Sequence, residues 1–206
     1  MSDFYCYPGT KVLTNRFQIM DDAELDRVES NIVFLKLAER DRLAGICRPG
    51  FQLKELRALH AFLFGDIYDW AGTIREIEMI KHEEILGGPS VQYSYPTEIE
   101  HDARAALRKL HQTQWTAPIE TVAERLALSG AVLWQVHPFR EGNTRTFITF
   151  LCEMAEYHGH AINRGLFRRK AGFTRNALVM ASLGKYAEPE YLIHIFHDAL
   201  ADEGAE

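Results

Sequence analysis

Residues 119–157 read IETVAERLALSGAVLWQVHPFREGNTRTFITFLCEMAEY, two apolar helical patterns with a polar loop between them. Apolar side chains recur every three or four positions up to Trp134, and again from Thr144 onward. This spacing is typical of amphipathic helices. The intervening residues, 137–145, combine a histidine, an acid, two arginines and a Gly-Asn pair. Because functional side chains concentrate in loops that a rigid scaffold holds, we expect this loop to carry the chemistry.

The same periodicity predicts five more helices elsewhere in the chain. Their predicted ranges are 21–43, 53–64, 97–110, 173–183 and 188–201. Residues 1–20 carry turn signals and little periodicity, so we expect an irregular N-terminal arm there. Because no linker is long enough to divide the chain, residues 1–206 are predicted to form a single, mainly α-helical domain.

A period of two replaces the helical spacing between residues 73 and 95. Ile77 and Met79 alternate with glutamates before a Gly-Gly-Pro break, and the residues from Val91 on alternate between apolar and polar. This pattern predicts a β-hairpin flap over 73–95. An isolated hairpin is marginal in water, so we expect it to lie against the helices with one edge free. A strand of another chain can pair with such an edge.

The composition excludes several classes of protein. The chain has 23 basic and 29 acidic side chains, a formal net charge of −6, which argues against a general nucleic-acid binder but allows a local nucleotide pocket. Three widely spaced cysteines fit neither a disulfide framework nor a zinc ribbon. We find no apolar run of about 18 residues and no signal segment, so we expect no membrane span and a cytoplasmic location.

Each residue type in the loop has a physical reason to be there. His137 precedes a proline, so its backbone should be extended and its ring should point away from the preceding helix. The pair Gly142 and Asn143 can adopt positive φ, which lets backbone N–H groups converge on an anion at the helix start. Arg145 opposes the helix dipole unless an anion lies there. Glu141 suits a divalent cation between a carboxylate and a phosphate. Singly each is an ordinary loop residue, but together they predict an anion site.

The loop resembles a known family. His-Pro-Phe-Arg-Glu-Gly-Asn at 137–143, followed by Arg145, resembles the signature of Fic-domain proteins, whose usual form is HxFx(D/E)GNGRxxR. Tyr7-Pro8-Gly9-Thr10 followed by Asn15 resembles the N-terminal arm of bacterial members, and residues 64–75 resemble the segment that leads into the family's target-binding flap. The resemblance extends over about residues 5–200.

The resemblance implies a helical protein that transfers AMP from ATP to a hydroxyl group of a target protein and releases pyrophosphate. It implies that His137 is the general base toward a Tyr, Thr or Ser hydroxyl and that Glu141 holds Mg²⁺. The flap would bind the target through Ile77, Met79 and Ile80. The residues implied to bind ATP are Phe139, which also anchors the loop in the core, Gly142, Asn143, Thr144 and Arg145.

The sequence departs from the usual signature at two positions. Thr144 replaces the second glycine, so the chain must have negative φ there or bear strain, although the hydroxyl can bond a phosphate or cap the helix. Ile148 replaces the second arginine, which in the family binds the terminal phosphate and pairs with an inhibitory glutamate. Three alternatives stay open: AMP transfer with weaker ATP binding, a different phosphate-containing donor, or a degenerate domain that binds a nucleotide and a peptide without AMP transfer.

We find no complete inhibitory motif, (S/T)xxxE(G/N), in the chain. Ser94 and Glu98 have the right spacing, but Ile99 follows them. A separate antitoxin-like protein therefore supplies the inhibition, or, without an arginine at 148, none of this kind is needed.

Other clusters admit two interpretations each. His194 and His197, at i and i+3, can ligate a metal ion, but solvated positions on a helix face are favoured. The basic run 164–170 can contact phosphates, but a solvated turn is favoured. Tyr93 and Tyr95 are either core residues, the favoured interpretation, or sites of self-modification.

Overall fold

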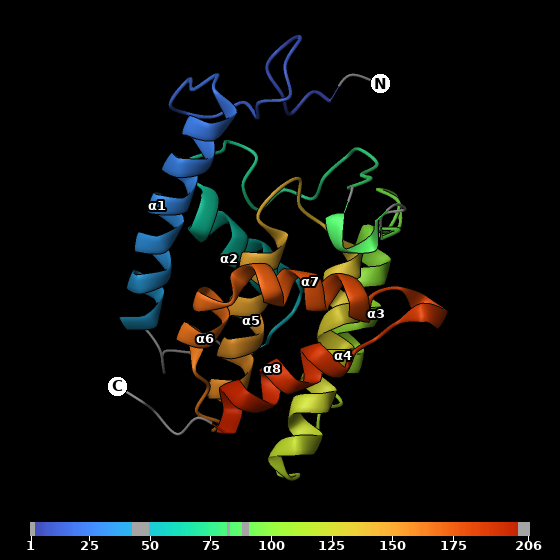
Figure 1. The fold of residues 1–206 in the computed structure, drawn as a ribbon. Coiled ribbons are helices and arrows are strands. Elements are labelled where there is room, and N and C mark those ends of the chain that lie inside the picture. Colours follow the sequence, from blue (N-terminus) through green and yellow to red (C-terminus); the bar gives the residue numbers. More distant parts are fainter. Residues whose placement is uncertain (1–2, 43–49, 82, 88–90, 202–206) are drawn as a thin grey trace.

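The computed structural model of the chain describes residues 3–42, 50–81, 83–87 and 91–201 (Figure 1). This part is mainly α-helical, as predicted, and all seven predicted helices are present. The helices are α1 (Asp22–Arg42), α2 (Leu53–Phe64), α3 (Ile99–Leu110), α4 (Ile119–Val136), α5 (Asn143–Tyr157), α6 (Arg164–Arg169), α7 (Ala171–Ala181) and α8 (Glu190–Ala201), with the 3-10 turns η1 (Glu84–Leu86) and η2 (Gly184–Tyr186).

Helices α4 and α5 form the centre of the core and hold the loop between them. Trp134 in α4 and Phe147, Phe150 and Met154 in α5 are almost fully buried. Helix α4 packs against α3, α7 and α8, while α5 packs against α2, α4 and α6 (Figure 1). Burying one large apolar side chain contributes roughly 1.5–3 kcal/mol, so this packing fixes both helix ends that flank the loop.

Helix α6 was not predicted, and the interpretation of 164–170 as a solvated turn is wrong. The Asn163 side chain caps the helix by accepting a hydrogen bond from the Leu166 N–H at 3.1 Å. Arg164 and Arg168 both pair with Asp41 of α1, and Arg164 also bonds Glu156 of α5. These arginines therefore join α6 to α1 and α5.

The β-hairpin predicted over 73–95 is not confirmed. The described residues on both sides of η1 form no strand and no strand pairing, and the predicted tip at Gly88 and Pro89 lies outside the described residues. A side chain takes the place of a backbone ladder. The buried guanidinium of Arg75 donates hydrogen bonds to the carbonyls of Ile77 and Ser94, one on each limb of the segment.

The N-terminal arm is irregular, as predicted, and lies over the end of the molecule where α1 begins (Figure 1). Within the described residues, its bridge between Cys6 and Leu13 is the only β pairing. Asp3 accepts two hydrogen bonds from the Arg140 guanidinium, at 2.9 and 2.7 Å, which ties the arm to the loop at 137–142. No helix in the described ranges combines the length and apolar character that a bilayer crossing requires.

Candidate functional site

His137 ends α4 in a left-handed conformation, with φ 50° and ψ 58°. The prediction of an extended backbone at His137 is therefore wrong, and the ring contacts Trp134 of α4 rather than pointing away from that helix. The His137 N–H donates to the Trp134 carbonyl at 3.0 Å, which closes the last turn of the helix. Arg75 fixes the peptides that follow, because its Nε donates to the His137 carbonyl and its backbone N–H to the Pro138 carbonyl, both at 2.8 Å. These contacts hold a backbone conformation that is uncommon outside glycine.

The His137 imidazole is enclosed rather than open to solvent. It is 1% exposed, stacks on the Tyr93 ring at 3.9 Å between centroids, and meets the Trp134 ring edge-on at 5.4 Å. Burial, together with the positive charges of Lys81 and Arg75, lowers its pKa well below 6.5. The ring is therefore neutral at pH 7, the form that can accept a proton.

Residues 91–95, which follow η1 and are called the covering segment below, cover His137 through a chain of contacts. The Tyr93 hydroxyl donates to the Glu83 carboxylate at 3.3 Å, and Arg175 of α7 donates two hydrogen bonds to the same carboxylate, at 2.7 and 2.9 Å. Glu83 is buried, so these hydrogen bonds offset the cost of removing its carboxylate from water. Tyr93 is a core residue, as favoured from the sequence, whereas Tyr95 is 53% exposed and the core interpretation is wrong for it.

Gly142 has the positive φ that the sequence predicted, at 77°, and leads into α5. A Cβ atom at this position would lie 2.3 Å from the Phe64 ring, so only glycine fits. Asn143 is already helical, and its side chain turns inward. Its Oδ1 accepts from the Phe139 N–H at 3.0 Å, and its Nδ2 donates to the Phe139 carbonyl at 2.7 Å. Asn143 thus closes the loop, and Phe139 is fully buried, as the anchor role implies.

Glu141 provides the carboxylate of the site. One oxygen accepts from the Gly142 N–H at 3.0 Å and the other from the Lys81 ammonium at 3.1 Å. Burial alone would raise the pKa of Glu141, but Lys81, the Gly142 N–H and Arg145 outweigh it and lower the pKa to about 2. The described residues contain no group of three side chains that could hold a metal ion. One ionised carboxylate beside a helix N-terminus nevertheless fits Mg²⁺ that also binds substrate phosphates.

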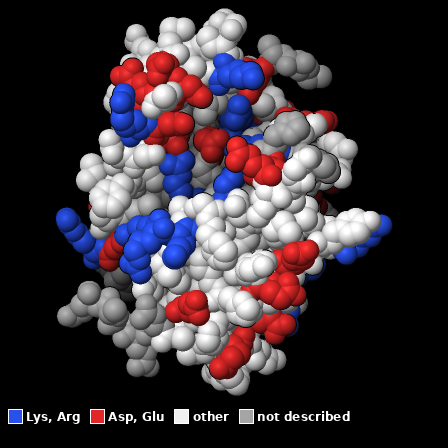
Figure 2. Space-filling model, in the orientation of Figure 1, with Lys and Arg blue, Asp and Glu red and all other residues white. Residues whose placement is uncertain are grey.

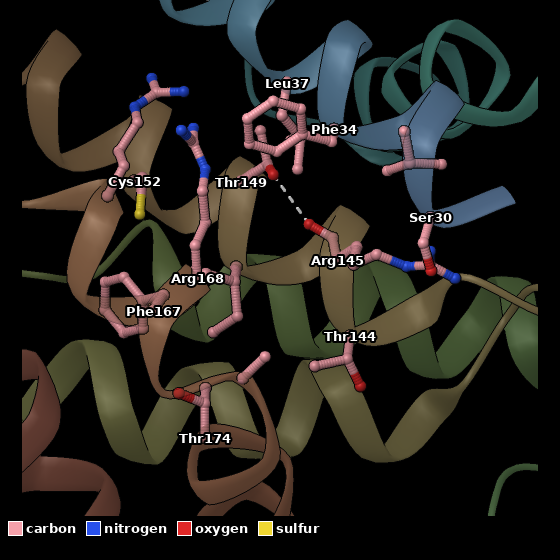
Figure 3. A pocket seen from close by; sticks show the side chains of 14 residues that line it. Ser30, Phe34, Leu37, Thr144, Arg145, Thr149, Cys152, Phe167, Arg168 and Thr174 are labelled. Atoms are coloured by element: carbon pink, nitrogen blue, oxygen red, sulfur yellow. Dashed lines mark hydrogen bonds between the residues drawn. The ribbon is translucent and has the colours of Figure 1, made fainter. Parts of the chain in front are cut away.

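Arg145 lies in the first turn of α5 and is paired within the protein. Its guanidinium contacts the Glu29 carboxylate of α1 and lies 4.9 Å above the Phe64 ring. Figure 3 shows the Arg145 side chain extending from α5 toward Ser30 of α1. The buried Glu29 also accepts a hydrogen bond from the Tyr68 hydroxyl. The sequence prediction placed an external anion beside Arg145, but the structure shows an internal counter-charge there.

Thr144 resolves the departure from the usual signature without strain. It lies in the first turn of α5 and is not among the residues with positive φ. Its Oγ1 accepts a hydrogen bond from the Trp134 indole Nε1 at 3.0 Å. The threonine therefore connects the start of α5 to the end of α4 across the loop.

A cavity of about 320 Å³ lies beside the start of α5, between α1, α6 and α7. Its walls are mostly apolar, and Figure 3 shows Phe34, Leu37 and Phe167 on them. Thr144, Arg145 and Ile148 also line it, whereas His137 and Glu141 do not. The sequence prediction required the imidazole, the carboxylate and the guanidinium to meet around one ligand. In this structure, the imidazole is enclosed by the Tyr93 and Trp134 rings and does not reach the cavity.

His60 is a site residue that the sequence did not reveal. Its Nδ1 accepts from the Gly72 N–H at 2.8 Å, and its Nε2 donates to the Glu141 carbonyl at 2.9 Å. Its ring stacks on Phe139 at 3.9 Å. Burial lowers its pKa to about 4 against the opposing effect of the bond to Glu141. In the sequence, His60 lies on the apolar face of the helix predicted over 53–64. A polar residue on a face expected to be buried was the only indication that it has a structural role.

The remaining histidine pairs are explained by local contacts. His158 stacks on Trp115 at 4.3 Å, and the His160 Nε2 bonds the Trp115 carbonyl at 2.8 Å. His194 is exposed and His197 lies within 4.0 Å of acidic side chains, with no metal-binding group of three within the described ranges. Figure 2 shows basic and acidic side chains interspersed over the upper half of the face in view, with a cluster of basic side chains below them on the left.

Of the three flap residues predicted to bind a target, only Ile80 is strongly exposed, at 82%. Ile77 and Met79 are partly buried against the core. All three lie between Arg75 and η1 on backbone without helix or strand, and Ile77 is at a bend.

Comparisons with known proteins support the resemblance seen in the sequence. A sequence model of the Fic/DOC family matches residues 50–155. The probable protein adenylyltransferase y4lH of Sinorhizobium fredii is 33% identical over 176 residues, which cover 82% of this chain and 84% of the relative. The protein adenylyltransferase VbhT of Bartonella schoenbuchensis is 30% identical over 164 residues, 79% of this chain but 32% of the relative, so the chain spans about a third of that protein.

Solved structures share the fold. The BepC protein of Bartonella tribocorum with bound AMPPNP aligns with a TM-score of 0.79 and 21% identity, covering 95% of each chain. The N-terminal Fic domain of a Bartonella quintana effector with bound ADP aligns with a TM-score of 0.78 and 21% identity, covering 95% of this chain and 93% of that one.

Proposed function

Because the chain belongs to the Fic/DOC family, we propose that it transfers AMP from ATP to a hydroxyl group of a target protein. The relatives reported above are named a protein adenylyltransferase and a probable one, and two solved structures with this fold carry AMPPNP or ADP. The observation that carries the proposal is the loop from His137 to Arg145. It places a neutral histidine, an ionised carboxylate and a helix N-terminus within one connection.

In the proposed reaction, the neutral imidazole of His137 takes the proton from a Tyr, Thr or Ser hydroxyl of the target. The hydroxyl oxygen then forms a bond to the α-phosphorus of ATP, the bond from that phosphorus to its bridging oxygen breaks, and pyrophosphate leaves. A positioned general base contributes about 10²–10⁴ to the rate.

The start of α5 supplies the phosphate contacts. The N–H groups of Asn143, Thr144 and Arg145 have no partner within the helix ladder, so they can donate to phosphate oxygens. Glu141 would hold Mg²⁺, which supplies charge neutralisation at the phosphates when it is bound. Lys81 occupies one oxygen of Glu141 and has to leave it for the metal.

The covering segment also has to move for the reaction. Tyr93 stacks on the imidazole, so a target hydroxyl reaches His137 only when that ring withdraws. We propose that residues Ile77, Met79 and Ile80 then pair with an extended stretch of the target and present its hydroxyl. The strong exposure of Ile80 supports this role, because an apolar side chain outside the core is free to contact an added strand.

The test is incubation of the purified protein with a bacterial lysate or itself and α-labelled Mg·ATP, with mass spectrometry of any AMP adduct. His137→Ala is expected to abolish labelling while the circular dichroism spectrum stays unchanged, and the exposed His194→Ala serves as the matched control. Label that still moves in His137→Ala would contradict the assignment of the base.

The alternatives correspond to other outcomes of the same experiment. Because Ile148 cannot bind a terminal phosphate, ATP binding without any transfer would identify a degenerate binding domain. Transfer from another phosphate-containing donor would identify a different substrate. A separate antitoxin-like protein remains a prediction, and its addition to the labelling reaction would test it.

A further inference from the structure

The imidazole of His137 has no hydrogen bond that fixes its orientation. Both ring nitrogens are buried without a partner among the described residues. A catalytic histidine is commonly oriented by a hydrogen bond to the nitrogen that does not react. Here the orientation depends on packing, with Tyr93 across the ring face and Trp134 at a 90° interplanar angle.

Of these two rings, only Trp134 can orient His137 during the reaction. Tyr93 has to withdraw before a hydroxyl can reach the imidazole, whereas Trp134 belongs to α4 and is fully buried. Trp134 also accepts the His137 N–H through its carbonyl at 3.0 Å, so it contacts both the backbone and the ring of the histidine.

The position of the Trp134 ring depends in turn on Thr144. A buried indole N–H needs an acceptor, and the one it finds is the Thr144 Oγ1, at 3.0 Å. The usual signature has glycine at this position, which offers no side-chain acceptor. The threonine therefore supplies the acceptor that the buried indole N–H of Trp134 needs, three residues before His137.

We propose that Thr144 is a positioning residue, which holds the Trp134 indole so that this ring fixes the imidazole of His137. The predicted effect on the rate rests on the proposed function, whereas the packing of Thr144, Trp134 and His137 does not. While it accepts from the indole, the threonine hydroxyl can still donate its own proton. Direct binding of a nucleotide phosphate is therefore the alternative role for this side chain.

The rate test compares three substitutions on the same helix. Thr144→Val keeps the shape but loses the acceptor, and we expect kcat for AMP transfer to fall about tenfold while KM for ATP stays within about twofold. Thr144→Ser keeps the acceptor and should retain the rate. Thr149→Val is the matched control, because the Thr149 hydroxyl only donates to the Arg145 carbonyl one turn back (Figure 3).

A double-mutant cycle separates the proposed route from a direct effect. Trp134→Phe keeps an aromatic ring but removes the N–H, so Thr144→Val should cost less than about twofold in that background. An equal loss in both backgrounds would overturn the proposal. A rise in KM for ATP at unchanged kcat would also overturn it, because Thr144 would then act on the nucleotide.

A third measurement needs no activity. In protein labelled with ¹⁵N-histidine and free of nucleotide, Thr144→Val should move or broaden the ring signals of His137, whereas Thr149→Val and Thr144→Ser should not. A wild-type protein without AMP transfer would refute the proposed function and leave this test intact. Unchanged His137 signals in a folded Thr144→Val protein would refute the positioning role.

Discussion

His60→Phe tests whether a buried histidine holds the loop at Glu141. Phenylalanine keeps a ring to stack on Phe139, but it leaves the Gly72 N–H and the Glu141 carbonyl without their partners. A buried backbone group without a partner costs roughly 1–3 kcal/mol. We therefore expect the free energy of unfolding at pH 7 to fall by about 2–6 kcal/mol.

The pH dependence makes this prediction specific to the histidine. The Glu141 carbonyl can only accept and the Gly72 N–H can only donate, so His60 is neutral, with its proton on Nε2. Protonation of Nδ1 would put two donors face to face. Burial holds the pKa of His60 at about 4 in the folded protein, against an ordinary value of 6.5.

The sign follows from proton binding. Between pH 6.5 and about 4 the unfolded chain binds a proton at His60 that the folded protein does not, so stability falls as the pH falls. The full difference is worth about 3 kcal/mol, and most of it is lost by pH 4.5. The gap between wild type and His60→Phe should therefore shrink by about 2–3 kcal/mol from pH 7 to pH 4.5.

Urea unfolding at both pH values measures this gap. His137 titrates in both proteins, so its contribution cancels in the comparison. His194→Phe, at an exposed position, should follow the wild type at both pH values. Parallel curves for wild type and His60→Phe, with the same gap at pH 7 and pH 4.5, would refute the assignment of a neutral, doubly bonded His60.

Two further substitutions test the contacts around the site. Glu29→Gln removes the buried carboxylate that pairs with Arg145, so we expect the free energy of unfolding in urea to fall by about 1–3 kcal/mol. Glu24→Gln, at an exposed position of the same helix, should change it little, and equal losses in the two variants would contradict the buried pair. Arg175→Gln removes the ion pair with the buried Glu83, which also holds Tyr93 over His137. Diethyl pyrocarbonate should therefore modify His137 faster in this variant, as measured by peptide mass spectrometry. An unchanged rate would mean that this ion pair does not hold the covering segment over His137.

The helices were predictable because their cause is local. Apolar side chains at helical spacing in 119–136 and 143–157 are buried in the core, and the structure places both helices where the pattern does. Helix α6 was missed because Arg164 and Arg168 make a short segment look solvated. Their partners, chiefly Asp41, are distant in sequence.

The loop was predicted in its residue types but only partly in its geometry. Gly142 has a positive φ and lies too close to the Phe64 ring to carry a Cβ atom. Both features require glycine, so the residue type made this part of the geometry predictable. For His137, the rule for a residue before proline favoured an extended backbone. The end of α4 and two hydrogen bonds from Arg75 override that preference. The charged partners Lys81 and Glu29 lie far from the loop in sequence, so no local pattern reveals them.

Arg75 explains why the flap pattern misled and why the covering segment bears on His137. A period of two in 73–95 predicts strands, but a ladder requires the backbone groups of the two limbs to face each other. One guanidinium bonds the Ile77 and Ser94 carbonyls, and its Nε bonds the His137 carbonyl at 2.8 Å. Both limbs and the loop at 137–145 thus share one buried cation. We therefore expect displacement of either limb to change the bonding of that guanidinium, and so to act on the backbone of His137 through a single side chain.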